Sequence, residues 1–341
     1  MMLGDLGADV LKIERPGSGD DTRGWGPPFD HAGRSAYFLS VNRNKLSVAA
    51  DLASEHDRQF IAALAREADV VLDNFRAGTL ERLGLSPDAL CRENPALVWC
   101  TIGGFDAGSD RPGYDFVVQA ECGWMAITGE ADRDPMKVGV ALGDVLAGKD
   151  AAIAILARLG RAGMGGRVRI SLAASARAAL VNVAQNVLVS GRDAARWGNA
   201  HPNLVPYQAF HAADRVIVIA VGNDAQWVAC ARTLGLESLA ADAALATNAG
   251  RVAQRDRVCA AMAGSLATRD AAHWQRVLDG AGVPNGLVRS VLEAIADVAA
   301  SPITGMPSSV GGEVRLEPPF LDEHGPLVRD RGWAAFGDLA H

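Results

Sequence analysis

The feature that most constrains this fold is an alternation of short apolar runs with segments of helical periodicity through the first half of the chain. The apolar runs predict four β-strands, at residues 8–14, 46–50, 70–72 and 97–102. Between two of them, residues 55–68 place Phe60, Ile61 and Leu64 on one helical face. Strands spaced by helices form βαβ units, so the sequence predicts an α/β domain with a parallel, doubly wound sheet.

Further elements follow before the middle of the chain. Helices are predicted at 116–126 and 145–159, and the glycines at 160–166 then turn the chain into a strand at 168–172. Residues 173–189 predict one long helix that is apolar nearly all round. A helix of that kind is expected to be buried, within the chain or against another subunit.

A second unit begins after a polar, proline-containing stretch at 191–206. The pattern restarts with a strand at 216–221 and helices near 225–234, 252–266 and 271–281, which predicts a smaller α+β domain. We expect three parts: a large domain at 1–195, a small domain at 205–300, and a tail at 301–341 that returns to the large domain. Residues 314–316 are expected to form a strand there.

Composition excludes several classes of function. The chain has 341 residues, enough for two domains, and a net charge of −7 with no basic stripe, which argues against a nucleic-acid partner. Its five cysteines are scattered without metal-ligand spacing, as expected of reduced thiols in a cytosol. No apolar run approaches membrane-spanning length. We therefore expect a cytoplasmic protein with no membrane partner and no bound metal.

Asp144 lies at the predicted start of the helix at 145–159. Aspartate is a favoured N-cap, because its carboxylate accepts backbone N–H bonds and the helix dipole stabilises its charge. The simplest interpretation is therefore a structural cap. The functional alternative is an ionised carboxylate that attacks an acyl carbon, with Gly143 and Gly148 leaving room for a bulky ligand.

Two loops after predicted strands carry candidate ligand-binding residues. Residues 73–78 (Asp-Asn-Phe-Arg-Ala-Gly) lie between a strand and a helix, where doubly wound sheets bind ligands. Arg76 and Arg82 offer charge for phosphates and Phe75 a face for adenine, although an ordinary loop with solvated arginines fits equally well. Arg15 follows the first strand in a glycine-containing loop that lacks dinucleotide-binding or P-loop spacing.

Several segments together resemble the class III coenzyme A transferases, the CaiB/BaiF family, which includes formyl-CoA and carnitine CoA-transferases and the α-methylacyl-CoA racemases. The likeness runs through nearly the whole chain. It is carried by residues 6–20, 22–28, 42–45, 73–78, 113–115, 143–144, 201–208 and 282–286.

The resemblance implies a Rossmann-like large domain built from both chain ends, a smaller middle domain, and an interlocked homodimer. It implies a CoA-transferase with Asp144 as nucleophile, which forms an aspartyl–acyl anhydride and then an aspartyl–CoA thioester. Coenzyme A enters as substrate, and no tightly bound cofactor is implied. The residues that match CoA contacts are Arg15, Asn74, Phe75, Arg76, Arg82, Gly113, Tyr114 and Asp115. Residues 201–210 look most like relatives that use succinyl-CoA and dicarboxylic acids.

Two departures from the family pattern bear on function. Racemases of the family carry a histidine base directly before the aspartate of the 113–115 motif, and this chain has Tyr114 there, which favours transfer over racemisation. The chain also opens at Met1, where the family has the helix after its first strand, so we expect that strand to be missing. An acyl-CoA racemase or a truncated, inactive CoA-binding homologue therefore remain the alternatives to a transferase.

Overall fold

The computed structural model describes residues 1–106, 109, 111–161, 163–306 and 311–339. The chain divides into two compact units. Unit 1 contains residues 1–122, 139–181 and 295–341, so it draws on both ends of the chain. Unit 2 contains residues 123–138 and 182–294.

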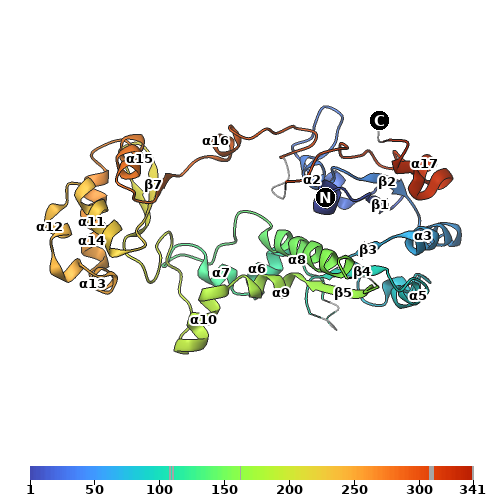
Figure 1. Ribbon diagram of the computed structural model, residues 1–341, viewed down its shortest axis with the longest axis horizontal. Coiled ribbons are helices and arrows are strands. Elements are labelled where there is room, and N and C mark those ends of the chain that lie inside the picture. The colour runs from blue at the N-terminus through green and yellow to red at the C-terminus, as the bar shows by residue number, and fades with distance from the viewer. Residues whose placement is uncertain (107–108, 110, 162, 307–310, 340–341) are drawn as a thin grey trace. The chain divides into compact units, whose positions relative to one another are not determined.

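The strands of unit 1 are all parallel but form two separate sheets (Figure 1). In one sheet β1 (Leu11–Glu14) pairs with β2 (Leu46–Ala49). In the other the order is β3 (Val70–Asp73), β4 (Val98–Gly103), β5 (Gly166–Ser171). The strands predicted near 8–14, 46–50, 70–72, 97–102 and 168–172 are therefore present. The predicted α/β class with parallel pairing is confirmed.

Helices connect these strands and begin at residues suited to capping. Ser54 accepts the Asp57 N–H at the start of α3, and Ser86 caps α5, which has proline as its first residue. The helices of unit 1 are α1 (Met2–Asp5), α2 (Ala36–Val41), α3 (Glu55–Glu67), α4 (Thr79–Arg82), α5 (Pro87–Glu93), α6 (Asp115–Glu121), α8 (Leu142–Leu159), α9 (Leu172–Ala178) and α17 (Gly325–Arg331), with 3-10 turns η1 (Asp21–Gly24) and η3 (Gly332–Phe336).

The longest helix, α8, packs on β4 and β5 (Figure 1). Ala151 and Ile155 on its inner face meet Val98, Cys100 and Val168 in one core cluster. Burial of these side chains fixes the rotation of α8 about its axis. That rotation in turn determines where the first turn of α8, which contains Asp144, presents its side chains.

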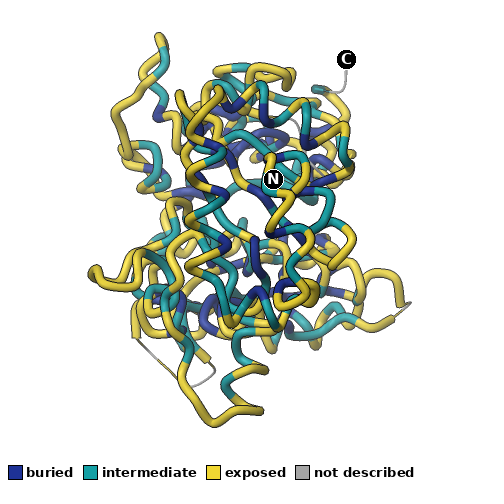
Figure 2. The backbone as a smooth tube through the Cα atoms, turned by 90° about the vertical axis from the view of Figure 1, so that its left-hand side faces the viewer, coloured by how far each residue is buried: buried dark blue, intermediate teal, exposed yellow. Residues whose placement is uncertain are grey.

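Unit 2 has its own antiparallel sheet and hydrophobic core. The strand order is β6 (Tyr207–His211), β7 (Val216–Ala220), β8 (Asn285–Leu287). Trp227, Met262 and Leu278 are among its buried core residues, drawn dark blue in Figure 2. Its helices are α7 (Trp124–Ile127), α11 (Asp224–Thr233), α12 (Glu237–Ala240), α13 (Asn248–Ala253), α14 (Arg255–Leu266) and α15 (Ala271–Gly280), with the 3-10 turn η2 (Ala243–Leu245); α10 (Val181–Ser190) and α16 (Val291–Ile295) lie at the boundaries of the unit.

Three predicted helices are each broken in two. The helix expected at 173–189 is divided into α9 and α10, and Val181 has a positive φ of 34° at the break. α9 is largely buried, but α10 has no buried residue, and Leu188 and Val189 are each 78% exposed, so burial of the whole segment within the chain is wrong. The segment at 116–126 breaks before Gly123, whose φ of 89° ends α6, and the segment at 252–266 breaks at Gln254.

The strand expected at 314–316 is absent, because a side chain takes the place of a pairing strand. The Asn44 Oδ1 accepts the backbone N–H groups of Arg315 (2.6 Å) and Leu316 (2.9 Å). The Asn44 N–H in turn donates to the Leu316 carbonyl. The tail is thereby held to unit 1 without a strand ladder.

Candidate active site

Asp144 lies in the first turn of α8 and is not its N-cap. The helix begins at Leu142, three residues earlier than predicted, and its N-cap is Ala141, which has no capping side chain. The predicted capping role of Asp144 is therefore wrong. The helix starts early because another element supplies the cap.

That cap is Asp115, the first residue of α6. Its Oδ1 accepts the backbone N–H of Gly143 at 2.7 Å, and its Oδ2 accepts the Nε2 of Gln119 at 2.7 Å. Gln119 is fully buried. A Cβ on Gly143 would lie 2.9 Å from the same Oδ1, so glycine permits this close approach. The two carboxylates of the site are thus brought together by a hydrogen bond to the residue before the nucleophile candidate.

The carboxylate of Asp144 remains unpaired in the part of the chain that the structure describes, where no hydrogen bond or ion pair reaches it. The residue is solvent-accessible, yet neighbouring protein atoms desolvate the carboxylate on one side. This desolvation, and then the negative charge of Asp115, raise the pKa of Asp144 above its ordinary value. An unpaired carboxylate with a raised pKa is a better nucleophile than one held by an arginine.

Two aromatic residues that sequence reasoning missed also belong to this site. Burial raises the pKa of Tyr37 on α2, and the negative charges of Asp144 and Asp115 raise it further, so Tyr37 lies within electrostatic range of both carboxylates. The Trp25 ring meets the Tyr37 ring edge-on, with centroids 5.0 Å apart. Trp25 lies in the 22–28 segment that carries the family resemblance, which was the available signal. Tyr37 had none beyond its place in a short helix.

Gly113 and Tyr114 form the approach to α6. Gly113 packs directly on Gly104, which follows β4, and this contact fixes the backbone that leads to Asp115. The Tyr114 side chain is 66% exposed. The predicted site residues 113–115 are therefore adjacent to Asp144 through Asp115.

The loop after β3 is held in place by the buried Asp73, and the residues predicted to bind CoA are exposed on it. Asp73 is buried and accepts hydrogen bonds from the Trp99 indole N–H, the Thr101 hydroxyl and the Phe75 backbone N–H. Asn74, Phe75 and Arg76 are all exposed. Arg82, one turn into α4, donates to the Thr79 hydroxyl at 3.1 Å.

Arg15 occupies the equivalent position after β1. Its guanidinium is exposed and pairs with Asp21. Thus Arg15 and Asn74 each directly follow the carboxyl end of a parallel strand, Arg15 after β1 in one sheet and Asn74 after β3 in the other. Within the described residues, no hydrogen bond or ion pair joins Arg15 or residues 74–76 to Asp144.

A family model described as CoA-transferase family III matches residues 1–303. The chain belongs to CoA-transferase family III. The predicted family is thereby confirmed.

Relatives and solved structures agree with this assignment. Succinyl-CoA:glutarate CoA-transferase of Mus musculus is 37% identical, over 95% of this chain and 80% of the relative. Succinate–glutarate CoA-transferase of Agrobacterium fabrum is 39% identical, over 87% of this chain and 77% of the relative. The crystal structure of a CAIB/BAIF family protein from Brucella suis matches with a TM-score of 0.85 at 38% identity, covering 96% of this chain and 93% of that one.

The family segment at 201–208 lies in unit 2, where it is held by that unit's own helices. Arg255 donates to the carbonyls of His201 (3.0 Å) and Pro202 (2.8 Å), and the buried Arg251 donates to that of Val205 (2.8 Å). Asn248 accepts the Val205 N–H. These bonds fix the path of the backbone through the segment.

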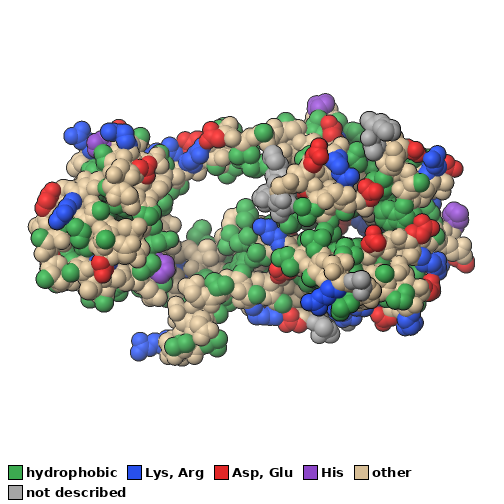
Figure 3. All heavy atoms as spheres, in the orientation of Figure 1, with side chains coloured by type: hydrophobic (Ala, Val, Ile, Leu, Met, Phe, Trp, Pro, Cys, Tyr) green, Lys and Arg blue, Asp and Glu red, His purple; other side chains and the backbone are tan. Residues whose placement is uncertain are grey.

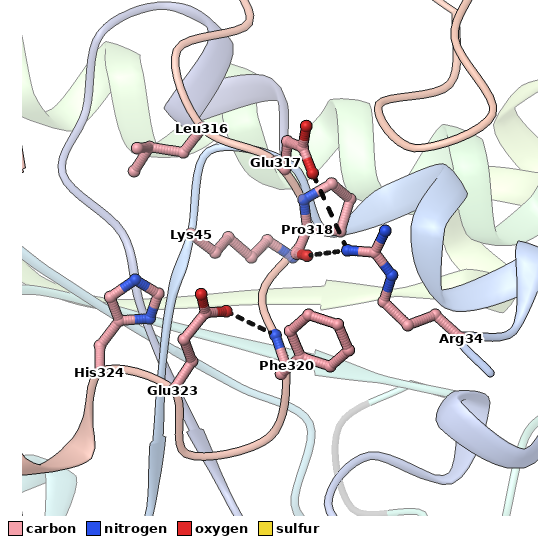
Figure 4. Close-up of a pocket in the computed structure, with 8 residues that line it drawn as sticks. All are labelled: Arg34, Lys45, Leu316, Glu317, Pro318, Phe320, Glu323 and His324. Atoms are coloured by element: carbon pink, nitrogen blue, oxygen red, sulfur yellow. Dashed lines mark hydrogen bonds and ion pairs between the residues drawn. The ribbon is translucent and has the colours of Figure 1, made fainter. Parts of the chain in front are cut away.

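A cavity of about 260 Å³ lies in unit 1 between residues near the N-terminus and the C-terminal tail (Figure 4). Burial lowers the pKa of Lys45 at its centre to about 8. Its described lining includes neither Asp144 nor a predicted CoA contact and consists of Arg34, Lys45, Leu316, Glu317, Pro318, Phe320, Glu323 and His324.

The described residues contain neither a cluster of metal-ligating side chains nor a single helix that could span a membrane. No group of three or more His, Cys, Asp or Glu side chains gathers there to hold a metal ion. No single described helix has the length and hydropathy of a membrane span. The consecutive helices α9 and α10 together have a sufficient length and composition, but the pair is bent by 70°. On the face drawn in Figure 3, basic and acidic side chains lie interspersed.

Proposed function

We propose that this protein transfers coenzyme A from an acyl-CoA donor to a carboxylic acid acceptor, with Asp144 as covalent nucleophile. The observation that carries the proposal is the Asp144 carboxylate itself. It is unpaired among the described residues and accessible to solvent, its pKa is raised, and it lies in the first turn of α8. Relatives named as succinyl-CoA:glutarate and acetyl-CoA:oxalate CoA-transferases support this reaction class.

The first half of the reaction forms the covalent intermediate. An Asp144 oxygen attacks the donor thioester carbonyl, the C–S bond breaks, and CoA leaves as the thiolate while an aspartyl–acyl anhydride remains. The thiolate then attacks the aspartyl carbonyl and the donor acid leaves as carboxylate. Asp144 now carries CoA as a thioester, and no net proton has been transferred.

The second half repeats these steps with the acceptor. Its carboxylate attacks the aspartyl–CoA thioester and releases the thiolate, which attacks the acceptor carbonyl of the new anhydride and regenerates Asp144. Each tetrahedral oxyanion needs hydrogen-bond donors. In the first turn of α8 the N–H groups of Leu142, Gly143 and Val145 already have acceptors among the described residues, which leaves the Asp144 N–H for that role. Tyr37 and Trp25 would limit water at the anhydride and the thioester.

CoA itself is assigned to the exposed residues at the carboxyl ends of β1 and β3. Arg15 and Arg76 would bind its phosphates and Phe75 would stack on its adenine. Asn74, Arg82, Gly113, Tyr114 and Asp115 complete the set by resemblance. The named relatives favour succinyl-CoA as donor and a dicarboxylate such as glutarate as acceptor.

We also propose that the active protein is a homodimer. The apolar helix α10 leaves Val181, Leu188 and Val189 exposed in the single chain, an arrangement that a second copy would cover. The family resemblance implies interlocked subunits. Sedimentation of the full chain would show a single subunit if this proposal is wrong.

Intact-protein mass spectrometry tests the transferase mechanism. The protein is incubated with succinyl-CoA, and the Asp144→Asn variant and an Asp150→Asn control are run beside it. Asp150 lies on the same helix and only accepts a bond from Ser175, which asparagine can retain. Wild type and control should gain a CoA adduct that hydroxylamine removes, and Asp144→Asn should gain none. A folded, CoA-binding wild type that forms no adduct with succinyl-CoA or other acyl-CoAs would refute the mechanism.

A further inference from the structure

We infer that Asp115 is a positioning residue, which sets the direction of Asp144 and holds a negative charge near its carboxylate. This inference rests on the proposed function and names a role for Asp115 other than contact with CoA. It begins from the start of α8, where Ala141 offers no capping side chain. The first turn of a helix leaves N–H groups unsatisfied, and here Asp115 on a different helix accepts one of them.

The position of Asp115 is itself fixed on both sides. Its Oδ1 is bound to the Gly143 N–H and its Oδ2 to Gln119, whose side chain also donates to the Val140 carbonyl at 3.3 Å. Gln119 therefore joins α6 to the segment that leads into α8. Because Gly143 directly precedes Asp144, a shift of Asp115 would move the nucleophile.

Asp115 also acts on Asp144 through charge. Among the described residues, Asp115 from α6 is the charged group that raises the pKa of Asp144, and Tyr37 from α2 is a titratable group that the Asp144 charge affects in turn. No described cation pairs with Asp144, so the negative charge of Asp115 is not offset at short range. Desolvation and this charge act in the same direction and favour the protonated form of Asp144.

Two substitutions distinguish the effect of the hydrogen bond to Gly143 from the effect of the negative charge on Asp144. Asp115→Asn removes the charge and keeps an oxygen for the Gly143 N–H, while its amide N–H₂ takes the place of the oxygen that accepts from Gln119, whose own amide can turn to accept it. Asp115→Ala removes both the charge and the hydrogen bond. Asp270→Asn is the matched control, because Asp270 caps α15 in unit 2 through the His273 N–H at 2.7 Å and takes no part in the site.

The first readout needs no activity. The carboxyl ¹³C resonance of Asp144, assigned by its loss in Asp144→Asn, is titrated in each protein. We expect both Asp115 variants to lower the Asp144 pKa, since a neighbouring negative charge has gone, and Asp270→Asn to leave it unchanged. An Asp144 pKa that is the same in wild type and both Asp115 variants would overturn the electrostatic part.

The second readout is the rate of adduct formation with succinyl-CoA as a function of pH. The acid limb should move to lower pH in both Asp115 variants. The plateau rate should fall about tenfold or more in Asp115→Ala and much less in Asp115→Asn, because a displaced nucleophile loses rate steeply. Equal plateau rates in wild type, Asp115→Asn and Asp115→Ala would show that Asp115 does not position the nucleophile. A lower Tm in the variants with no change in plateau rate or pH profile would show that Asp115 serves stability alone.

The two proposals fail in different ways. If wild type forms no adduct but the Asp144 pKa falls in Asp115→Asn, the transferase mechanism is wrong and the control of Asp144 by Asp115 stands. If wild type forms the adduct and neither readout responds to Asp115, the mechanism stands and the positioning role is wrong.

Discussion

Gly104 and Gly113 pack so closely that a Cβ on either one would lie 2.4 Å from the Cα of the other. Gly104 follows β4 and Gly113 comes two residues before Asp115, so this contact joins the end of a buried strand to the start of α6. Because α6 in turn caps α8, the backbone contact supports the geometry around Asp144.

Gly113→Ala is therefore expected to lower stability and activity together. The added methyl meets backbone atoms that cannot rotate away, and overpacking of this kind costs about 1–3 kcal/mol. Urea unfolding should show the loss, and adduct formation with succinyl-CoA should slow. Gly139→Ala is the control, since no atom lies within 4 Å of its Cβ position. Equal stability of the two variants would contradict the packing argument.

Gly148→Ala is expected to raise stability while weakening substrate binding. Gly148 lies four residues after Asp144 on the same face of α8, with open space above it. Alanine stabilises a helix interior by up to about 1 kcal/mol relative to glycine. If acyl-CoA crosses this face, its KM should rise severalfold. Gly264→Ala on α14 is the control and should raise the stability without a change in KM. If Gly148→Ala also leaves KM unchanged, the substrate does not cross this face of α8.

Local patterns were sufficient to predict the parallel strands of unit 1 and the segments α3 and α15. Each rests on apolar periodicity, which burial in a single chain determines. The breaks in the longer helices were not predictable in the same way. Val181 adopts a positive φ that valine disfavours, and α10 is exposed although its composition indicates burial. In the proposed homodimer a second copy would cover this segment, and a pattern read within one chain does not show that contact.

The residues of the candidate site likewise fall into those that a local sequence pattern indicated and those that only the tertiary structure brings together. Asp144 and the 113–115 segment followed from motifs, but the cap formed by Asp115 on Gly143 joins residues 28 positions apart and leaves no local pattern. Tyr37 reaches the site by tertiary packing alone. Sequence therefore indicated the candidate nucleophile and the 113–115 segment, whereas the groups around them could be found only from the fold.

Stability should fall as pH falls through the range where Asp20 is titrated. Burial alone would raise the pKa of Asp20, but hydrogen bonds from Lys12 and Thr22 outweigh it and lower the pKa to about 2. A folded pKa below the unfolded value of about 3.9 stabilises the protein above that value, and this stabilisation is lost as pH falls toward 2.

Lys12→Met tests the linkage. It should be less stable than wild type by about 1–2 kcal/mol at pH 6, with the difference shrinking toward pH 2. Urea unfolding at several pH values measures it. Lys137→Met is the control, because its exposed amine only reaches the neighbouring Val138 carbonyl. A difference that does not change with pH would mean that Lys12 stabilises by packing instead of charge.

Asp73→Asn is expected to loosen the loop that presents Asn74 to Arg76. The carboxylate accepts the Trp99 indole N–H and the Thr101 hydroxyl, both at 2.7 Å, and the Phe75 N–H at 2.9 Å. Asparagine replaces one accepting oxygen with a donor, so a buried donor loses its partner at a cost of about 1–3 kcal/mol.

The kinetics of Asp73→Asn show whether Asp73 supports the binding of CoA by the loop or the reaction of Asp144. If this loop binds CoA, KM for succinyl-CoA should rise while the rate of adduct formation at saturating donor stays near that of wild type. Thr101→Val is the comparison, since it removes one donor and leaves the bonds to Trp99 and Phe75. It should show smaller losses of both stability and affinity. A stability loss in Asp73→Asn with an unchanged KM would remove residues 74–76 from the CoA site and leave Asp73 as a purely structural anchor.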